Sequence, residues 1–272
     1  MSFKNIYNKI LLFIVVLVVA SCSKDTNSGE NNSSNNDDTS DPVETTKHIS
    51  KIIFYNNHQY SGELEYGYNN EKKITSIEEH YSNSFSRSLA VEYTNGSVSK
   101  IVMDVDNLPP NKEIHEEFIV EYNQNVILLN SQNIQIEFHV TNGYIDYTLD
   151  NNDTSGFGIS EIYYTRNSNN DIVSVDATLG GSNTYYTFSS FDNGKEYDPL
   201  EGAMFGYHSY FFQIFGLQAS KNNPLHAVVE GYQDYEINVD LEYDDENNVV
   251  SKNRETNISS TVYGYEYHYV EL

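Results

Sequence analysis

The chain has 272 residues with a formal net charge of −25 at pH 7, and it contains one cysteine and no tryptophan. So acidic a surface repels nucleic-acid phosphates and anionic lipid headgroups, which excludes nucleic-acid binding and leaves metal cations, cationic partners and neutral glycans as ligands. A single cysteine excludes an intramolecular disulfide and a thiolate metal site, so the hydrophobic core alone must stabilise the folded chain.

The first 21 residues have the pattern of a secretory signal peptide. Lys4 and Lys9 precede an apolar run that is shorter than the roughly 20 residues needed to span a bilayer. The run ends in Val19-Ala20-Ser21-Cys22, which resembles the bacterial lipobox, whose cysteine is acylated and becomes the first mature residue. Because Cys22 is the sole cysteine, we expect it to be lipidated; the alternative is an ordinary signal whose cleavage site adjoins a free thiol.

The segment from residue 22 to residue 47 is predicted to be a disordered polar and acidic tether. Between Ser23 and Thr46 its one apolar side chain is Val43, which cannot offset the entropy lost on ordering. Ser23-Lys24-Asp25 resembles the export signal that sends some lipoproteins to the outer face of the outer membrane. We therefore expect a surface-exposed outer-membrane lipoprotein, with a periplasm-facing one as the alternative.

Residues 48–272 are predicted to form a single β-meander repeat domain. Aromatic and β-branched residues alternate with polar ones in units of about 20 residues, each with a polar turn between two strands. The turns fall at residues 69–73, Asn95-Gly96, Asn142-Gly143, 169–171 and 244–248. This spacing predicts an all-β antiparallel meander, as a rolled sheet or a partly open barrel.

One segment, Glu201 to Leu217, breaks the strand pattern. Its apolar residues recur at intervals of three and four, which predicts one short amphipathic helix, with a buried strand pair as the alternative. These residues are Met204, Tyr207, Tyr210, Phe211, Ile214 and Phe215.

Two acidic segments approach the twelve-residue calcium loop, which needs oxygen ligands at alternate positions and a glycine at the sixth. Asp244, Glu246, Asn248 and Glu255 supply the oxygens, but Val249 occupies the glycine position; a segment from Asp150 to Glu161 departs in the same way. A solvated hairpin turn is the favoured interpretation of both. The eight histidines form no zinc motif, and we expect no cofactor.

The closing strand has four tyrosines, Tyr263, Tyr265, Tyr267 and Tyr269, in strict alternation. Alternate residues of a strand lie on one face, so the four rings form a ladder. Such a ladder is either cross-strand packing or an aromatic platform for a ligand such as a sugar. Packing is favoured, because tyrosine is spread through all the repeats and tryptophan is absent.

The repeat units resemble the Tyr-Asp repeats of RHS-type proteins, with Tyr243-Asp244 and the residues up to Val250 as the nearest copy. The order of Phe191-Asp192-Asn193-Gly194, Asp198-Pro199, Asn223-Pro224 and the tyrosine-rich end is similar to a family of bacterial lipoproteins carrying a domain of unknown function with a porin-like fold. The resemblance implies the fold and the envelope location. It implies no activity, because the family has none established.

No catalytic or nucleotide-binding motif occurs in the chain, so we expect a non-enzymatic binding or structural module of unknown ligand. We expect its partner to be a glycan or a protein. The acyl anchor would be its only contact with the membrane, and the protein would be a monomer. The alternative is a secreted carbohydrate-active enzyme or glycan-binding protein at the outer membrane surface, which needs two converging carboxylates for hydrolysis. A membrane-embedded barrel is disfavoured, because runs such as Ser76-Ile77-Glu78-Glu79-His80 carry charges on both faces.

Overall fold

The computed structural model describes residues 47–83, 85–108, 112–150, 159–179, 182–192, 208–231 and 233–272. The signal peptide, the lipidation candidate Cys22 and the tether before residue 47 lie outside the described residues, as do residues 201–207 of the predicted helix. The strands and the helix of the described ranges are β1 (Lys47–Asn56), β2 (Gln59–Tyr68), β3 (Ile74–Tyr81), β4 (Ser86–Thr94), β5 (Ser97–Leu108), β6 (Lys112–Asn123), β7 (Val126–Asn130), β8 (Gln135–Thr141), β9 (Tyr144–Asp150), β10 (Ile159–Arg166), β11 (Ile172–Leu179), β12 (Ser182–Phe191), α2 (His208–Phe215), β13 (Pro224–Glu230), β14 (Tyr235–Tyr243), β15 (Val249–Thr256) and β16 (Ser259–Glu271).

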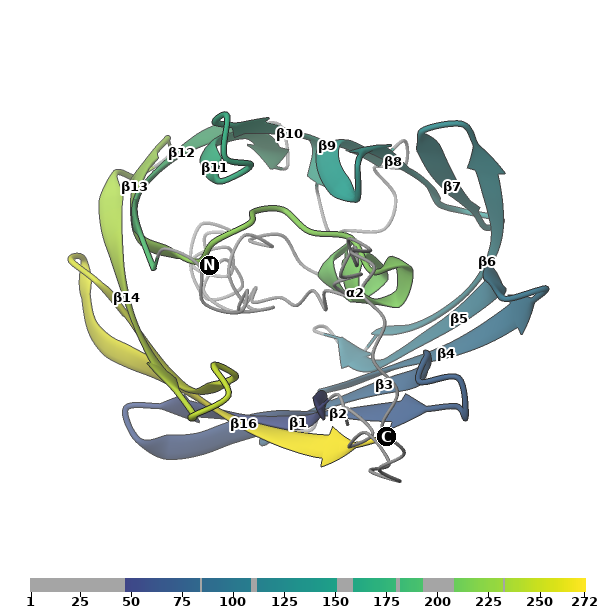
Figure 1. Cartoon of the computed structure of the whole chain (residues 1–272), viewed down its shortest axis with the longest axis horizontal. Helices are drawn as coiled ribbons and strands as arrows, with labels where there is room; N and C mark the ends of the chain where they lie inside the picture. Colours follow the sequence, from purple (N-terminus) through teal and green to yellow (C-terminus); the bar gives the residue numbers. More distant parts are fainter. Residues whose placement is uncertain are drawn as a thin grey trace, which may run out of the picture.

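The strands form one closed barrel. Each pairs antiparallel with the next in sequence, and β1 pairs with β16, with Ile52 opposite Tyr267 and Phe54 opposite Tyr265. Figure 1 shows the strands as a closed oval ring with α2 inside it. The predicted all-β antiparallel meander is confirmed, as is the one short helix within the predicted segment. The sheet is closed, so that neither β1 nor β16 is left as an unpaired edge.

Three turns on one rim of the barrel share the same local hydrogen bonds. In each, the first residue is Asn or Asp, and its side-chain oxygen accepts the backbone N–H groups two and four residues later, as Asn and Asp do in many turns. A residue with positive φ, Lys72, Asn170 or Asn247, stands before the last position. The turns comprise residues 69–73, 167–171 and 244–248. They explain why the repeats carry Asn and Asp between strands.

The two Asn-Gly hairpins are tighter. Asn95 and Gly96 have φ of 52° and 81°, and Asn142 and Gly143 have φ of 53° and 82°. Positive φ at both central residues is the requirement of the type I′ turn, which matches the twist of the flanking strands. The sequence therefore specifies these connections locally.

Four tyrosine hydroxyls bind backbone carbonyls near the same rim. Each tyrosine lies close to the end of a strand and donates to the start of a strand 19 to 24 residues earlier in the chain. The pairs are Tyr68 to Ile49 (2.6 Å), Tyr93 to Ile74 (2.7 Å), Tyr122 to Val98 (3.2 Å) and Tyr269 to Val249 (2.8 Å). The hydroxyls thus satisfy carbonyls at strand ends, a physical reason for the tyrosine content of the repeats.

The inward face of the barrel is mostly apolar, and the outward face is charged. The inward residues include Ile52, Leu64, Ile77, Leu89, Ile101, Phe118 and Phe138, all 1% exposed or less. Their strand neighbours on the outward face include Lys51, Glu63, Glu65, Glu78, Lys100 and Glu117. Because strand residues alternate between the two faces, the charges cover the outside of β1 to β6.

Helix α2 fills part of the barrel interior with aromatic side chains. Tyr210, Phe211 and Phe212 are at most 2% exposed. The Phe212 ring lies 5.4 Å from that of Phe138 and 6.3 Å from that of Tyr164, and Phe211 lies 5.5 Å from Phe118. A sixteen-strand ring is wide enough to enclose an aqueous channel, so the packed helix supplies side chains that the strands alone lack. No helix in the described ranges is both long and apolar enough to cross a membrane.

Candidate functional sites

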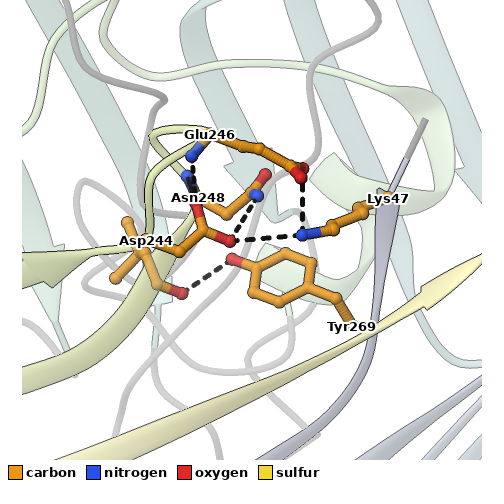
Figure 2. A network of polar contacts seen from close by, with 6 residues as sticks. Lys47, Asp244, Glu246, Asn248 and Tyr269 are labelled. Atoms are coloured by element: carbon orange, nitrogen blue, oxygen red, sulfur yellow. Dashed lines mark hydrogen bonds and ion pairs between the residues drawn. The ribbon is translucent and has the colours of Figure 1, made fainter. Parts of the chain in front are cut away.

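The β14–β15 turn binds the residue at which the barrel begins. Lys47 Nζ lies 2.9 Å from Glu246 Oε2 and 3.4 Å from Asp244 Oδ2 (Figure 2). Asn248 donates its side-chain amide to Asp244 Oδ2 at 2.8 Å, and Tyr269 closes the group by its hydrogen bond to Val249. The first residue of β1 is thereby held against the β14–β15 turn, beside β16, whose pairing with β1 closes the ring.

Burial works against the charge of Asp244, but hydrogen bonds from Asn248 and from the Glu246 amide, together with nearby Lys47, lower its pKa. The hydrogen bond to Glu246 raises the pKa of Lys47 in turn. The Asp244 and Glu246 carboxylates therefore bind an amide and an ammonium group, and the turn is a structural junction between the start of β1 and the β14–β15 hairpin.

The calcium candidates are only partly brought together. Asp244, Glu246 and Asn248 share the turn, whereas Glu255 lies near the other end of β15, opposite Asn238 and Val262. Glu255 is the sixth residue after Val249, about 20 Å further along the extended chain. Among the described residues, no group of three or more His, Cys, Asp or Glu side chains converges as a metal site would require. The solvated hairpin turn stays the favoured interpretation of this segment, with a calcium loop as the alternative.

The tyrosine ladder of the closing strand lies on the inward face. Tyr265 and Tyr267 are 5% and 4% exposed, and Tyr263 and Tyr269 pack partly buried against the core. The Tyr265 ring lies edge-on to Phe54 at 5.8 Å, and Lys252 Nζ lies 5.1 Å from its centroid. Rings placed inside the barrel favour the packing interpretation over the ligand platform.

A buried ion pair contacts α2 inside the barrel. Arg87 Nη1 lies 3.2 Å from Glu79 Oε2, and the Arg87 guanidinium lies 5.3 Å from the Tyr210 ring centroid. Burial opposes the charge of Arg87, but the Glu79 carboxylate raises its pKa; burial also raises the pKa of Tyr210, so its hydroxyl stays protonated. The ion pair connects β3 and β4 to helix α2, so we interpret it as a structural contact that holds the helix in place.

A line of side chains crosses the outward face of six neighbouring strands and forms a further candidate site. We call it the outer aromatic row. Cross-strand pairing connects its members one to the next, from His139 on β8 to Glu230 on β13. They are His139, Tyr147, Tyr163, Asp176, Tyr185 and Glu230.

The rings of this row are preorganised and accessible. Tyr147 and Tyr163 stack with centroids 4.4 Å apart, and His139 lies 5.1 Å from Tyr147. Tyr163 and Tyr185 are each 47% exposed, and the Asp176 carboxylate raises the pKa of Tyr185. Sequence reasoning missed this surface, because each strand contributes a single residue. The dipeptides Tyr163-Tyr164 and Tyr185-Tyr186 were the available signal, since adjacent strand residues must place one ring outside.

The closed ring of antiparallel strands around a helix defines the chain as a β-barrel protein. No family model matches it, and no curated protein is a significant match. The crystal structures that resemble it include two of porin-like proteins. The one from Bacteroides vulgatus ATCC 8482 is 10% identical, with 82% of this chain and 99% of that chain covered and a TM-score of 0.44. The one from Bacteroides uniformis ATCC 8492 is 12% identical, with 83% and 99% covered and a TM-score of 0.41. Similarities this distant give no information about the activity of this protein.

Proposed function

We propose that the protein is a lipid-anchored lipoprotein of the bacterial cell envelope, whose barrel is a non-enzymatic binding or structural module. The observation that carries the proposal is the lipobox-like Val19-Ala20-Ser21-Cys22 with the only cysteine at its end. The resemblance to lipoproteins with Tyr-Asp repeats supports it, as does the solvated composition of the following segment.

The charged outside of β1 to β6 supports anchoring over insertion of the barrel. A bilayer-spanning barrel needs an outward apolar band about 25 Å tall. Glu63, Glu65 and Glu78 instead occupy outward positions near the middle of their strands. We propose that the acyl chains alone contact the membrane and that the barrel is monomeric.

The polar segment from Cys22 to residue 46 would separate the barrel from the lipid surface. If it is the disordered tether that its composition predicts, its root-mean-square length would be roughly 30 Å. The barrel's first residue, Lys47, is held at the rim by Asp244 and Glu246, so the anchor would attach at this rim. We propose surface display on the strength of Ser23-Lys24-Asp25, and cleavage by an external protease on intact cells tests it against a periplasm-facing protein.

Metabolic labelling with an alkyne fatty acid tests the anchor. The full chain should incorporate the label, and Cys22→Ser should abolish it. A Ser21→Ala variant keeps a small residue beside the cysteine and serves as the control, which should stay labelled. Undiminished labelling of Cys22→Ser would overturn the proposal.

Glycan binding is the second candidate, and the exposed rings of Tyr163 and Tyr185 favour it, because tyrosine can stack on sugars. A glycan array probed with the protein distinguishes it from a purely structural role.

A further inference from the structure

Among the described residues, the carboxylates of the outer aromatic row differ from those on the opposite side of the barrel, because they form no ion pair with a basic side chain. Glu63 and Glu65 pair with Lys51, and Glu117 pairs with Lys100. Within the described ranges, no ion pair joins Asp176 or Glu230 to a basic side chain. Two carboxylates thus lie in one line with exposed rings, and neither forms an ion pair with a basic side chain that the structure describes.

Glu161 extends this surface next to the row. It lies two residues before Tyr163 on the same face of β10 and accepts a hydrogen bond from the Tyr163 hydroxyl at 3.4 Å. Asp176 stands between Tyr163 and Tyr185 in the cross-strand register. The two exposed rings are therefore separated by two strand spacings, about 10 Å, with a carboxylate between them.

This arrangement suits a planar cation better than a neutral sugar. An arginine guanidinium stacks on a tyrosine face and pairs with a carboxylate at the same time. A neutral sugar would use the rings but leave the negative charge of Asp176 and Glu230 unbalanced. The formal charge of −25 adds long-range attraction for a basic partner.

We propose that the outer aromatic row binds arginine side chains of a basic partner polypeptide, with Tyr163, Asp176 and Tyr185 as its central contacts. The inference rests on the proposed binding role and names its partner class. An extended basic segment crossing β9 to β13 would meet a ring or a carboxylate at each strand.

The test uses the chain from residue 22 onward with Cys22→Ser, so that it can be studied without lipid. Nona-arginine, nona-lysine and cellohexaose are titrated by calorimetry at 0.15 M salt. Tyr163→Ala and Tyr185→Ala should each weaken nona-arginine binding about two- to fivefold, the range of an exposed cation–π contact. Asp176→Asn should weaken it by a similar factor, about two- to fivefold. The triple variant should lose about tenfold or more if the sites act independently.

Two matched controls isolate the row from general charge and exposure. Asp240→Asn removes an outward carboxylate on β14, and Tyr60→Ala removes a ring that is 50% exposed on β2; both should leave binding unchanged. Equal losses in the controls, or equal affinity for nona-lysine, would reduce the effect to diffuse electrostatics and overturn the inference. Absence of nona-arginine binding would also overturn it. Cellohexaose binding that Tyr163→Ala abolishes would replace it with glycan recognition, leaving the binding role intact.

Discussion

Helix α2 fills part of the barrel interior, and Phe212→Ala removes one of its buried rings. Phe212 is 1% exposed and packs against Phe138 and Tyr164. Replacing a buried Phe by Ala costs about 3–5 kcal/mol, from lost burial plus the cavity left behind. A barrel of this size loses roughly 2–4 °C of melting temperature per kcal/mol, so the variant should melt roughly 6–20 °C lower.

Guanidinium unfolding followed by circular dichroism measures the free-energy change, and calorimetry gives the melting temperature. The control is Ile119→Ala, because Ile119 is a large apolar residue on the outward face, 52% exposed. It should change the free energy of unfolding by less than about 1 kcal/mol. A loss below about 1 kcal/mol for Phe212→Ala would refute the reasoning, since the helix would then not be packed inside the ring.

Three further predictions follow from the polar contacts. Glu79→Gln should lower the free energy of unfolding in urea by about 3–5 kcal/mol, because it leaves the Arg87 charge buried without its anion. The double variant with Arg87→Met should recover part of this loss. If the losses of the two single variants simply add in the double variant, the two residues are not a coupled pair. Tyr93→Phe should cost about 1 kcal/mol. Burial raises the pKa of Tyr93 to about 12, so the hydroxyl's contribution to stability should be present below about pH 10 and should fade as the pH rises towards 12. If stability falls with rising pH in the variant as steeply as in the wild type, this assignment is wrong. Asp244 has a lowered pKa, so its contribution is present above its unfolded pKa of about 3.9 and is lost as pH falls through the folded value. Asp244→Asn should therefore flatten the acid limb of a melting curve series, and an identical acid limb would argue against the Lys47 junction.

The local features of the fold could be predicted from the sequence. Asn95-Gly96 forms the predicted hairpin because only a few residue types adopt positive φ at low cost. Helix α2 falls within Glu201 to Leu217 because a spacing of three and four suits a helix that faces a core.

Closure of the ring could not be predicted, because β1 and β16 meet across the whole domain. The Tyr55 hydroxyl donates a hydrogen bond to Glu266, 211 residues later in the chain, and no local turn motif specifies such a pairing. The Tyr265 ladder faces inward, as the favoured packing interpretation expects. Alternation alone fixes which residues share a face and not which face is inside, so that expectation depended on the spread of tyrosine through the repeats. The outer aromatic row depends on the register of six strands, so its members, such as Tyr163 and Tyr185, have no common sequence motif.

Membrane fractionation of the Cys22→Ser variant tests the central claim most directly, because it separates an anchored barrel from an inserted one. The wild-type protein should sediment with the membranes and resist carbonate extraction. The variant should be recovered in the soluble fraction without detergent, with the circular dichroism of a folded β protein. A folded variant that stays in the carbonate-resistant membrane fraction would contradict the account, since the barrel itself would then be the membrane-bound element.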